Sequence, residues 1–528
     1  MWLVVPSVPT PAPRRYLSPA MPTPRRADTL SRLAREPFDL LVIGGGINGA
    51  GIARDAALRG LSVALVERDD FASGTSSRSS RLIHGGVRYL EHGYLHLVFE
   101  ASRERRILLD TAPHLVQPLA FTWPVFRGDR IPRWKLGAGL WLYDLLATFK
   151  NVDRHRSLSA AGVLEREPHV RRNGLRGGAL YYDAATNDAR LTIANIIDAA
   201  TSGAAIANYC AVTALTRDGA RVSGATVRDA IGGGEFAVRA RRTVNAAGPW
   251  SDTIRQLDEA GHTPGVQGTK GVHIEVPRDR VGNREAVTVI SQVDGRVMFV
   301  LPAGADTIIG TTDTPTVSTP DNVRADEGDV DYLLRSANGT FPDARLTRDD
   351  VISSWAGIRP LIASGSTGSP ASASREHAIH SSVAGLISVS GGKLTTYRSM
   401  SAEVVDVAER ALGRSPTRAI TGTRALPRSD PDALIRRDVT LAEPLVTGLP
   451  HRRADFVCAA ESEFACRLGD FMIRRTHVAF ETRDHGRAAA PEVARLVAPV
   501  LGWTDADITR ELATYDAEVR RLFSVDPR

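Results

Sequence analysis

The stretch of residues 38–67 constrains the fold of this chain more than any other, because it contains a complete strand, helix and strand pattern. The apolar residues 40–43 form the first expected strand, and they lead into a G-x-G-x-x-G sequence made by Gly44, Gly46 and Gly49. The first glycine permits a tight turn, the second lets the backbone approach a pyrophosphate, and the third lets the helix pack closely on the strand. The second expected strand, residues 61–66, ends at Glu67, whose carboxylate can accept hydrogen bonds from an adenosine ribose. The stretch therefore predicts a bound adenine dinucleotide.

The composition fits a soluble protein of several domains. A chain of 528 residues exceeds one hydrophobic core, so two or three domains are expected. The three cysteines, Cys210, Cys458 and Cys466, form no C-x-x-C pair, so we expect neither a disulfide framework nor a metal site. The net charge of +6 comes without a long basic tract, so we expect no nucleic acid partner.

The order of the expected elements divides the chain into three parts. Residues 1–36 are rich in proline and arginine and are expected to be a disordered leader. Residues 37–415 are expected to form a discontinuous α/β nucleotide-binding domain. Short apolar runs and strands interrupt it at about 113–185 and 262–350, and they predict an inserted antiparallel-sheet lobe over the substrate. Residues 421–528 are expected to form a mostly helical domain for packing or docking.

The most apolar helix candidate spans residues 136–149. It is too short, and too interrupted by Asp144, to cross a bilayer. Two interpretations stay open. The helix is either a buried element of the lobe, or it lies in a membrane interface, flanked by the cations of Arg133, Lys135 and Lys150.

Three later stretches are expected to return to the first turn from far along the chain. Residues 69–90 form a polar loop whose many hydroxyl groups suit a ribityl-pyrophosphate chain better than a core. Residues 243–250 end a strand in a turn of small residues. Residues 386–398 have the pattern of strand, double glycine and helix, so the N-terminal dipole of that helix points at the turn. The negative charge of a reduced flavin would be stabilised there.

Six motifs taken together resemble the FAD-dependent, respiratory glycerol-3-phosphate dehydrogenases. They are the glycine fingerprint of residues 44–49 and the segments 75–91, 245–250, 309–313, 357–360 and 391–398. The resemblance covers roughly residues 38–412, and residues 468–476 resemble the helical C-terminal domain of that family. It implies an α/β, Rossmann-like fold of the glycine and D-amino-acid oxidase type, a noncovalent FAD, and electron delivery to a respiratory quinone in the membrane.

The motifs and the resemblance together assign candidate contacts to the cofactor. These candidates lie at the first turn, in the hydroxyl-rich loop and at the two later turns. They are Gly44, Gly46, Asn48, Gly49, Glu67, Thr75, Ser76, Ser77, Ser80, Ala247, Gly248, Gly391, Gly392, Leu394 and Thr395.

The substrate that the resemblance implies, glycerol 3-phosphate, requires cations near its phosphate. Arg88, Arg359 and Lys393 are the candidates, and Tyr89 is expected to shape the pocket or to hydrogen-bond the substrate. Lys393 stands between a double glycine and a helix, in a chain with only four lysines. This scarcity favours a specific use of its compact ammonium group.

Two histidines compete for the role of general base. His84 precedes two glycines that let a substrate approach, and an imidazole can accept a proton at neutral pH. His273 is the competitor, with Lys270 as a candidate electrostatic partner. Arg359 is counted among the catalytic candidates because it is expected beside the reacting group.

The expected reaction is the oxidation of sn-glycerol 3-phosphate to dihydroxyacetone phosphate by hydride transfer to FAD, with the electrons passed to a respiratory quinone. The expected location is the cytoplasm, with peripheral association with the inner face of the cell membrane, and a homodimer is an open alternative. Two other functions stay open. One is an oxygen-using FAD oxidase of the same fold that acts on an amine or hydroxy acid. The other is a flavin-binding regulatory protein without turnover.

Overall fold

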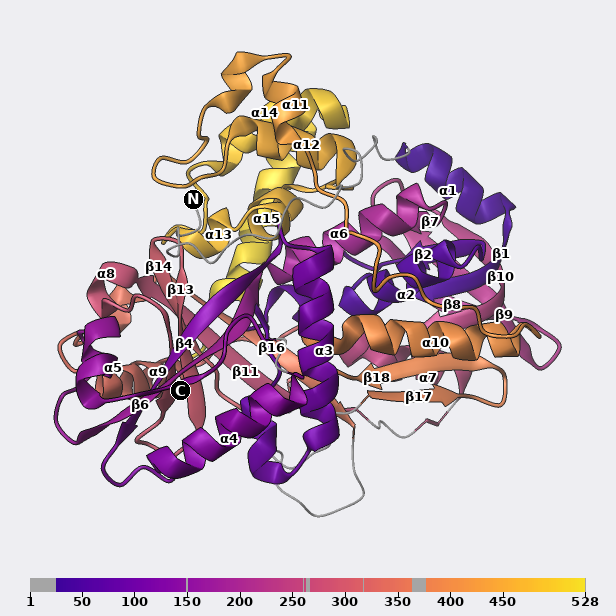
Figure 1. Cartoon of the computed structure of the whole chain (residues 1–528). Helices are drawn as coiled ribbons and strands as arrows, with labels where there is room; N and C mark the ends of the chain where they lie inside the picture. Colours follow the sequence, from indigo (N-terminus) through magenta and orange to yellow (C-terminus); the bar gives the residue numbers. More distant parts are fainter. Residues whose placement is uncertain are drawn as a thin grey trace.

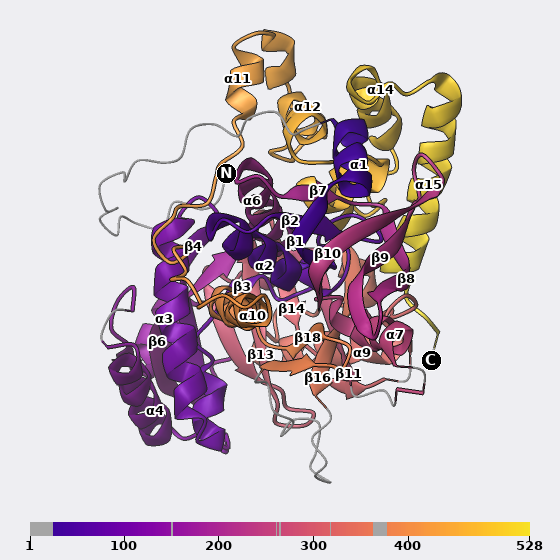
Figure 2. The same ribbon diagram turned by 90° about the vertical axis from the view of Figure 1, so that its right-hand side faces the viewer.

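The computed structural model describes residues 25–527, except 149–150, 260, 263–265, 317 and 363–376. Two sheets organise this part of the chain, and helices cover their outer faces (Figures 1 and 2). The C-terminal helices lie together at one end of the molecule, at the top of both views.

The first sheet contains the predicted strand-helix-strand unit. Within the described residues it has eight strands in the order β17-β18-β10-β1-β2-β7, with β9 pairing with β10 and β8 with β9. The strands from β18 to β7 run parallel, whereas β17 and β9 are antiparallel to their neighbours. The strands are β1 (Pro37–Ile43), β2 (Val63–Val66), β7 (Ala205–Ala207), β8 (Cys210–Asp218), β9 (Arg221–Asp229), β10 (Glu235–Asn245), β17 (His377–Ser381) and β18 (Leu386–Gly391).

Both faces of this sheet are buried, which explains the continuous apolar run in β1. Leu40 and Val42 face one side, where three helices cover them: α2 (Ile47–Leu58), α6 (Asp188–Thr201) and α10 (Tyr397–Ala411). Leu41 and Ile43 belong to a second core on the opposite side, together with residues of β8 and β9. The helix and strand pattern predicted for residues 38–67 is therefore present.

Residues 26–35 form helix α1 (Arg26–Arg35), so the expected disordered leader over residues 1–36 is wrong for this part. Leu33 is fully buried against the first sheet, and Arg26 forms an ion pair with Asp229 of β9 at 2.7 Å. The helix has only two leucines among its arginines, so its composition did not indicate a buried helix. Residues 1–24 lie outside the described part of the chain.

The second sheet forms the lobe beside the nucleotide fold. Its ten strands, counted over the described residues, follow the order β15-β11-β14-β13-β12-β4-β6-β3, with β16 on β11 and β5 on β6. All neighbours are antiparallel except β12 and β4. The strands are β3 (Leu82–Ile83), β4 (Val116–Phe126), β5 (Arg156–Leu158), β6 (Leu175–Thr186), β11 (Val266–Pro277), β12 (Ala286–Ile290), β13 (Val297–Ala303), β14 (Asp306–Gly310), β15 (Thr314–Pro315) and β16 (Ser353–Ile362).

Two of these strands, β3 and β16, lie outside the segments 113–185 and 262–350 that we expected to build the lobe. β3 has only two residues and pairs with β6, and β16 begins just after the second expected segment and pairs with β11. The helices attached to the lobe and to the edge of the first sheet are α3 (Leu95–Thr111), α4 (Arg133–Leu146), α5 (Ala160–Arg166), α7 (Ser251–Asp258), α8 (Arg278–Val281) and α9 (Glu327–Thr340).

The C-terminal region is mostly helical and contacts both sheets. Its helices are α11 (Pro431–Ile435), α12 (Arg453–Ser462), α13 (Val478–Glu481), α14 (Ala490–Leu501) and α15 (Asp505–Phe523), with a π-helical turn at Asp470–Arg475. Arg474 and Arg475 of that turn form buried ion pairs with Asp70, which follows β2, at 2.5 and 2.7 Å. Phe480 of α13 packs edge-on against Trp355 of β16. The region is thus fastened to the nucleotide fold and to the lobe.

Candidate active site

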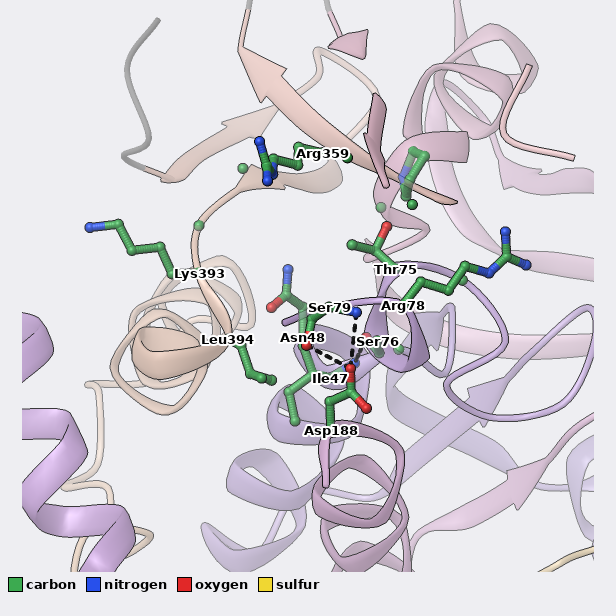
Figure 3. A pocket seen from close by; sticks show the side chains of 18 of the residues that line it. Ile47, Asn48, Thr75, Ser76, Arg78, Ser79, Asp188, Arg359, Lys393 and Leu394 are labelled. Atoms are coloured by element: carbon green, nitrogen blue, oxygen red, sulfur yellow. Dashed lines mark hydrogen bonds between the residues drawn. The ribbon is translucent and has the colours of Figure 1, made fainter. Parts of the chain in front are cut away.

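A cavity of about 430 Å³ lies where the two sheets meet. Its walls come from the first turn of the nucleotide fold, the hydroxyl-rich loop, the ends of β10 and β18, and strands β11 and β16 of the lobe. In Figure 3, Lys393 and Leu394 lie on the opposite side of Asn48 from Thr75 and Arg78. Segments that are more than 300 residues apart in sequence, such as Asn48 and Lys393, therefore line one site.

The first turn has the features that a pyrophosphate requires. Gly44 has a φ of +109°, and a Cβ there would lie 2.6 Å from the carbonyl oxygen of Ala246 at the end of β10. Helix α2 begins at Ile47 with Gly46 as its N-cap residue, and Gly46, Ile47 and Asn48 all line the cavity, so the positive N-terminus of the helix faces it. The hydroxyl of Ser76 accepts a hydrogen bond from the backbone N–H of Ile47 at 2.9 Å, which fastens the hydroxyl-rich loop to this helix (Figure 3).

Glu67 lies at the end of β2, as the sequence predicted, and its carboxylate accepts hydrogen bonds from the N–H groups of Gly45 (2.5 Å) and Asp69 (2.9 Å). Burial raises the pKa of this carboxyl to about 7, although those two hydrogen bonds oppose the shift. A buried carboxylate in this position gains from further hydroxyl donors, such as those of a ribose.

The loop that contains His84 is held from two sides. On one side, the Thr395 hydroxyl accepts from the backbone N–H of His84 and donates to its carbonyl oxygen, both at 3.1 Å. On the other side, the backbone N–H of Gly85 donates to the Tyr143 hydroxyl (2.9 Å) and to Asp183 (3.1 Å). Tyr143 and Asp183 in turn contact Arg105 of α3. His84 thus lines the cavity on a rigid support.

His273 of β11 also lines the cavity, and it is almost completely buried. Its Nε2 atom lies 2.8 Å from the Ser80 hydroxyl, and its ring stacks on Trp355 with centroids 5.4 Å apart. Burial, together with the charges of Arg359 and Arg81, lowers the pKa of His273 to about 3, so the imidazole is neutral. Lys270 is not its partner, because that side chain lies on the other face of β11 and pairs with Asp329 of α9 and with Asp326, the N-cap residue of that helix.

Two of the cations predicted for the phosphate, Arg359 and Lys393, line the same cavity as the two histidines. Arg359 pairs with Asp313 at 2.9 Å and donates to the Thr311 hydroxyl at 3.3 Å. Lys393 places its ammonium group 4.0 Å from the centre of the Tyr89 ring, a cation-π contact. The side chain of Arg88 lies outside the described set.

Several sequence candidates support the cavity without lining it. A Cβ at Gly49 would lie 1.9 Å from the carbonyl oxygen of Gly44, so this glycine brings helix and strand together. Ser77 is buried beside Gly74, and Thr395 holds the His84 loop. The other cofactor candidates line the cavity, which also has walls that the sequence did not indicate. These include Arg78, Ser79, Trp123, Tyr181, Asp188 and Phe299.

Asp188 illustrates why such residues were missed. It is the first residue of α6, and its buried carboxylate accepts hydrogen bonds from the hydroxyl (2.6 Å) and the backbone N–H (3.1 Å) of Ser79 (Figure 3). In sequence, an acidic residue at a helix start is an ordinary capping signal. Arg78, in contrast, lies within the hydroxyl-rich motif, and that position was a signal that could have been used.

A nucleotide-binding turn and a basic wall that bears two histidines define a class, the FAD-dependent oxidoreductases. Comparison with known proteins gives the same class. Residues 39–398 match the family described as FAD dependent oxidoreductase, and residues 422–508 match the family described as C-terminal domain of alpha-glycerophosphate oxidase.

Individual relatives narrow the class. Glycerol-3-phosphate dehydrogenase 2 of Mycobacterium tuberculosis is 40% identical over an alignment that covers 96% of this chain and 92% of that protein. The structure of glycerol-3-phosphate dehydrogenase from Bacillus halodurans complexed with FAD superposes with a TM-score of 0.76 at 31% identity, covering 94% of this chain and 97% of that one. Glycine oxidase from Geobacillus kaustophilus, at 22% identity and a TM-score of 0.54 over 74% of this chain and 99% of that one, shares the fold.

The chain belongs to the FAD-dependent glycerol-3-phosphate dehydrogenase family, and its cofactor is FAD. The predicted fold type and the predicted cofactor are both confirmed. The cavity fits that cofactor, because the N-terminus of α2 suits a pyrophosphate and the buried Glu67 carboxylate suits a ribose, and both line the cavity.

Proposed function

We propose that this protein oxidises sn-glycerol 3-phosphate to dihydroxyacetone phosphate and passes the electrons to a respiratory quinone. The observation that supports this reaction most directly is that Arg359, Lys393, His84 and His273 line one cavity. A phosphate ester needs cations at one end, and an alcohol oxidation needs a proton acceptor at the other. Bound FAD supplies the acceptor for the hydride that leaves C2.

The residues of the chain have separate tasks in this reaction. Lys393 and Arg359 bind the phosphate, and Tyr89 contacts Lys393 and shapes the pocket. We favour His273 over His84 as the base, because its imidazole is neutral and its Nε2 atom contacts Ser80, another residue that lines the cavity. Burial depresses the pKa of His273 most and two arginines add to this shift, and the negative charge of a bound phosphate would offset the part due to the arginines. His84 would then position the substrate on its rigid loop.

The test is anaerobic mixing of the purified flavoprotein with glycerol 3-phosphate. We expect the flavin absorption band to bleach, and a quinone analogue to restore it. Absence of bleaching with this substrate would refute the proposal. His273→Asn should slow bleaching far more than His84→Asn, and the reverse result would transfer the role of base to His84.

Oxygen is a second candidate for the electron acceptor, because residues 422–508 match a domain named after an oxidase. Reoxidation by air with release of stoichiometric hydrogen peroxide, faster than reoxidation by the quinone analogue, would establish this alternative. The regulatory, non-catalytic alternative requires that no substrate bleaches the flavin.

We further propose that the protein binds the inner face of the cell membrane through helix α4. Leu136, Leu140 and Tyr143 are buried, whereas the exposed side carries Trp134 (76% exposed) and Trp141 (57% exposed). Among the described residues, no helix has both the length and the apolar character needed to cross a membrane. Aromatic side chains beside the exposed cations of Arg133 and Lys135 suit the surface of an anionic bilayer instead.

Flotation with anionic lipid vesicles tests this surface. The double variant Trp134→Ala, Trp141→Ala should lose most vesicle binding while it keeps its FAD and its flavin reduction. Val439→Ala, which removes an equally exposed apolar side chain (76%) from the C-terminal region, is the matched control and should bind like the wild type. Equal binding of all three proteins would refute the proposed surface.

A further inference from the structure

Strand β11 has two different faces, although both are buried. Val272, Ile274 and Val276 belong to an apolar core that includes residues of α9. The alternate residues His273 and Glu275 face the opposite side, and both are buried, with exposed fractions of 3% and 0%. A buried, ionisable side chain two positions beyond a candidate base is unusual, because such a group is costly unless it is paired or used.

The neighbouring strands extend this polar face. On β16, Trp355 stands opposite His273 and Ser353 stands opposite Glu275. On β14, Ile308 stands opposite Glu275, and Asp306 follows on the same face, opposite Pro277. Directly opposed residues in an antiparallel pair have Cβ atoms only about 4.5–5.5 Å apart, and alternate residues on one strand are separated by about 7 Å. One row of polar groups therefore runs from the cavity along the sheet to Asp306.

Several polar atoms in and beside this row have no hydrogen-bond partner among the described residues, although Nε2 of His273 contacts Ser80. Within the described part of the chain, hydrogen-bond partners are lacking for both carboxyl oxygens of Glu275, Nδ1 of His273, Oγ of Ser353, Nε1 of Trp355 and Nη2 of Arg81. So many unsatisfied buried atoms in one place require an explanation, and ordered water that bridges them is the ordinary one.

The charged groups that face Glu275 come from three other elements. Arg81 lies just before β3, with its guanidinium over the rings of Trp355 (5.3 Å) and Phe480 (4.9 Å). Asp306 lies on β14 and Glu481 at the end of α13. Burial raises the pKa of Glu275 to about 8, with Glu481 and Asp306 adding to the shift and Arg81 opposing it. The buried His477 adjoins Arg81, and Asp306 is also influenced by Arg278, Asp279 and Arg483.

The far end of the row approaches solvent. Burial and the charge of Glu481 raise the pKa of Asp306 to about 6. Glu481 has 21% of its side chain exposed and pairs with His451, which is 19% exposed, at 3.0 Å. Exposure thus increases from His273 and Glu275 to Asp306 (8%) and then to Glu481. A proton that leaves the cavity along this row moves toward water.

We propose that Glu275 relays the substrate proton from His273 to solvent, through water held between their side chains. The proposal rests on the proposed oxidation and on His273 as its base. The C2 hydroxyl gives its proton to Nε2 of His273 while the hydride leaves C2 with two electrons, and the C2–O double bond forms. The proton on Nδ1 passes through water to the Glu275 carboxylate. Glu275 then releases that proton through Asp306 and Glu481, so one proton leaves for each substrate oxidised.

Glu275→Gln tests the relay, because glutamine keeps the shape of the side chain and its amide does not take up and release a proton as a carboxylate does. In anaerobic stopped-flow mixing with glycerol 3-phosphate, we expect flavin bleaching to slow by about 100-fold or more with an unchanged substrate KM. The rise of the wild-type rate through about pH 8 should disappear in the variant. In Glu275→Ala, added formate should restore part of the rate, which a merely structural role would not allow.

Glu167→Gln is the matched control. Glu167 is also a fully buried carboxyl whose pKa burial raises to about 7, but it accepts hydrogen bonds from the N–H groups of Arg284 and Glu285 outside the cavity. This variant should bleach at the wild-type rate. Glu275→Leu is the second test variant. It removes a costly buried carboxyl without leaving a large void, so it should fold, and it should bleach as slowly as Glu275→Gln.

Unfolding temperatures provide a readout that does not depend on turnover. Because the folded pKa of Glu275 lies above its ordinary value of 4.5, the wild type should lose stability relative to Glu275→Gln as the pH rises from about 4.5 to about 8. If both Glu275→Gln and Glu275→Leu bleach the flavin at the wild-type rate and with the wild-type pH profile, the relay is refuted and the proposed function stays intact. Failure of the wild type itself to bleach with glycerol 3-phosphate would refute the proposed function instead.

Discussion

The third glycine of the fingerprint offers the sharpest test of how the cofactor site is built. A Cβ added at Gly49 would lie 1.9 Å from the carbonyl oxygen of Gly44 and 3.0 Å from its carbon. Carbon and oxygen atoms in contact are usually about 3.3 Å apart or more, so α2 would have to withdraw by about 1.4 Å. Both groups belong to the backbone, so no rotation of a side chain can relieve the overlap.

Withdrawal of α2 is costly because the helix is enclosed. Ala50 and Ala53 are completely buried, in the same core as residues of α6 and α10. Overpacking of this kind destabilises a core by about 1–3 kcal/mol. The same movement displaces the helix N-terminus from the pyrophosphate position, so Gly49→Ala should both unfold at a lower temperature and lose FAD.

Gly139→Ala is the matched control for this substitution. Gly139 lies inside helix α4, and a Cβ there would meet no atom within 4 Å among the described residues. Replacing an unhindered glycine in a helix interior by alanine usually increases the free energy of unfolding by about 0.5–1 kcal/mol. Thermal unfolding and flavin absorbance after gel filtration measure both effects. A Gly49→Ala protein with full FAD and an unfolding temperature at or above that of the wild type would refute the reasoning.

Two further predictions concern charges. Lys393→Ala removes a charge-assisted contact of about 1.5–3 kcal/mol, so the KM for glycerol 3-phosphate should rise roughly 10- to 150-fold while FAD stays bound. The control Lys135→Ala should change neither the KM nor the FAD content. Loss of FAD from Lys393→Ala would instead assign Lys393 to cofactor binding. Asp70→Asn leaves Arg474 and Arg475 buried without their carboxylate, so it should lower the free energy of unfolding by about 3–5 kcal/mol, measured with urea. A decrease below about 1 kcal/mol would contradict this account. Burial alone would raise the pKa of Asp70, but the charges of Arg475 and Arg474 lower it to about 2. The stabilisation should therefore be complete above about pH 4, and wild type and variant should converge in stability as the pH falls toward 2.

Local signals were sufficient for the cofactor site at the first turn. The positions of Gly44, Gly49 and Glu67 follow from short-range geometry, because a turn, a helix contact and a strand end all lie within 30 residues. Local signals also identified Lys393, where a double glycine precedes a helix. They failed for helix α1, whose few leucines become a buried face only when the first sheet is present.

The lobe shows a different limit. The sequence Val272-His273-Ile274-Glu275-Val276 alternates apolar and polar residues, which is the ordinary pattern of a strand with one solvated face. From sequence alone, Glu275 would be assigned to water. The structure buries it because α13 and α15 of the C-terminal region pack against β16 on that side. No pattern within β11 contains this information, since the covering residues lie about 200 positions away.

This arrangement changes the significance of the C-terminal region. Phe480 covers Trp355 and Arg81, and Glu481 stands at the outer end of the polar row. The region therefore covers a face that would otherwise be wet and leaves the row a graded route to water. A sealed site benefits an oxidation in which a hydride must not be lost, but it also creates the need for a proton exit. The buried row on β11 meets that need only while the C-terminal helices remain docked. The contacts of Arg474 and Arg475 with Asp70 hold those helices on the nucleotide fold, so the proposed relay depends on these contacts, as does the stability of the fold.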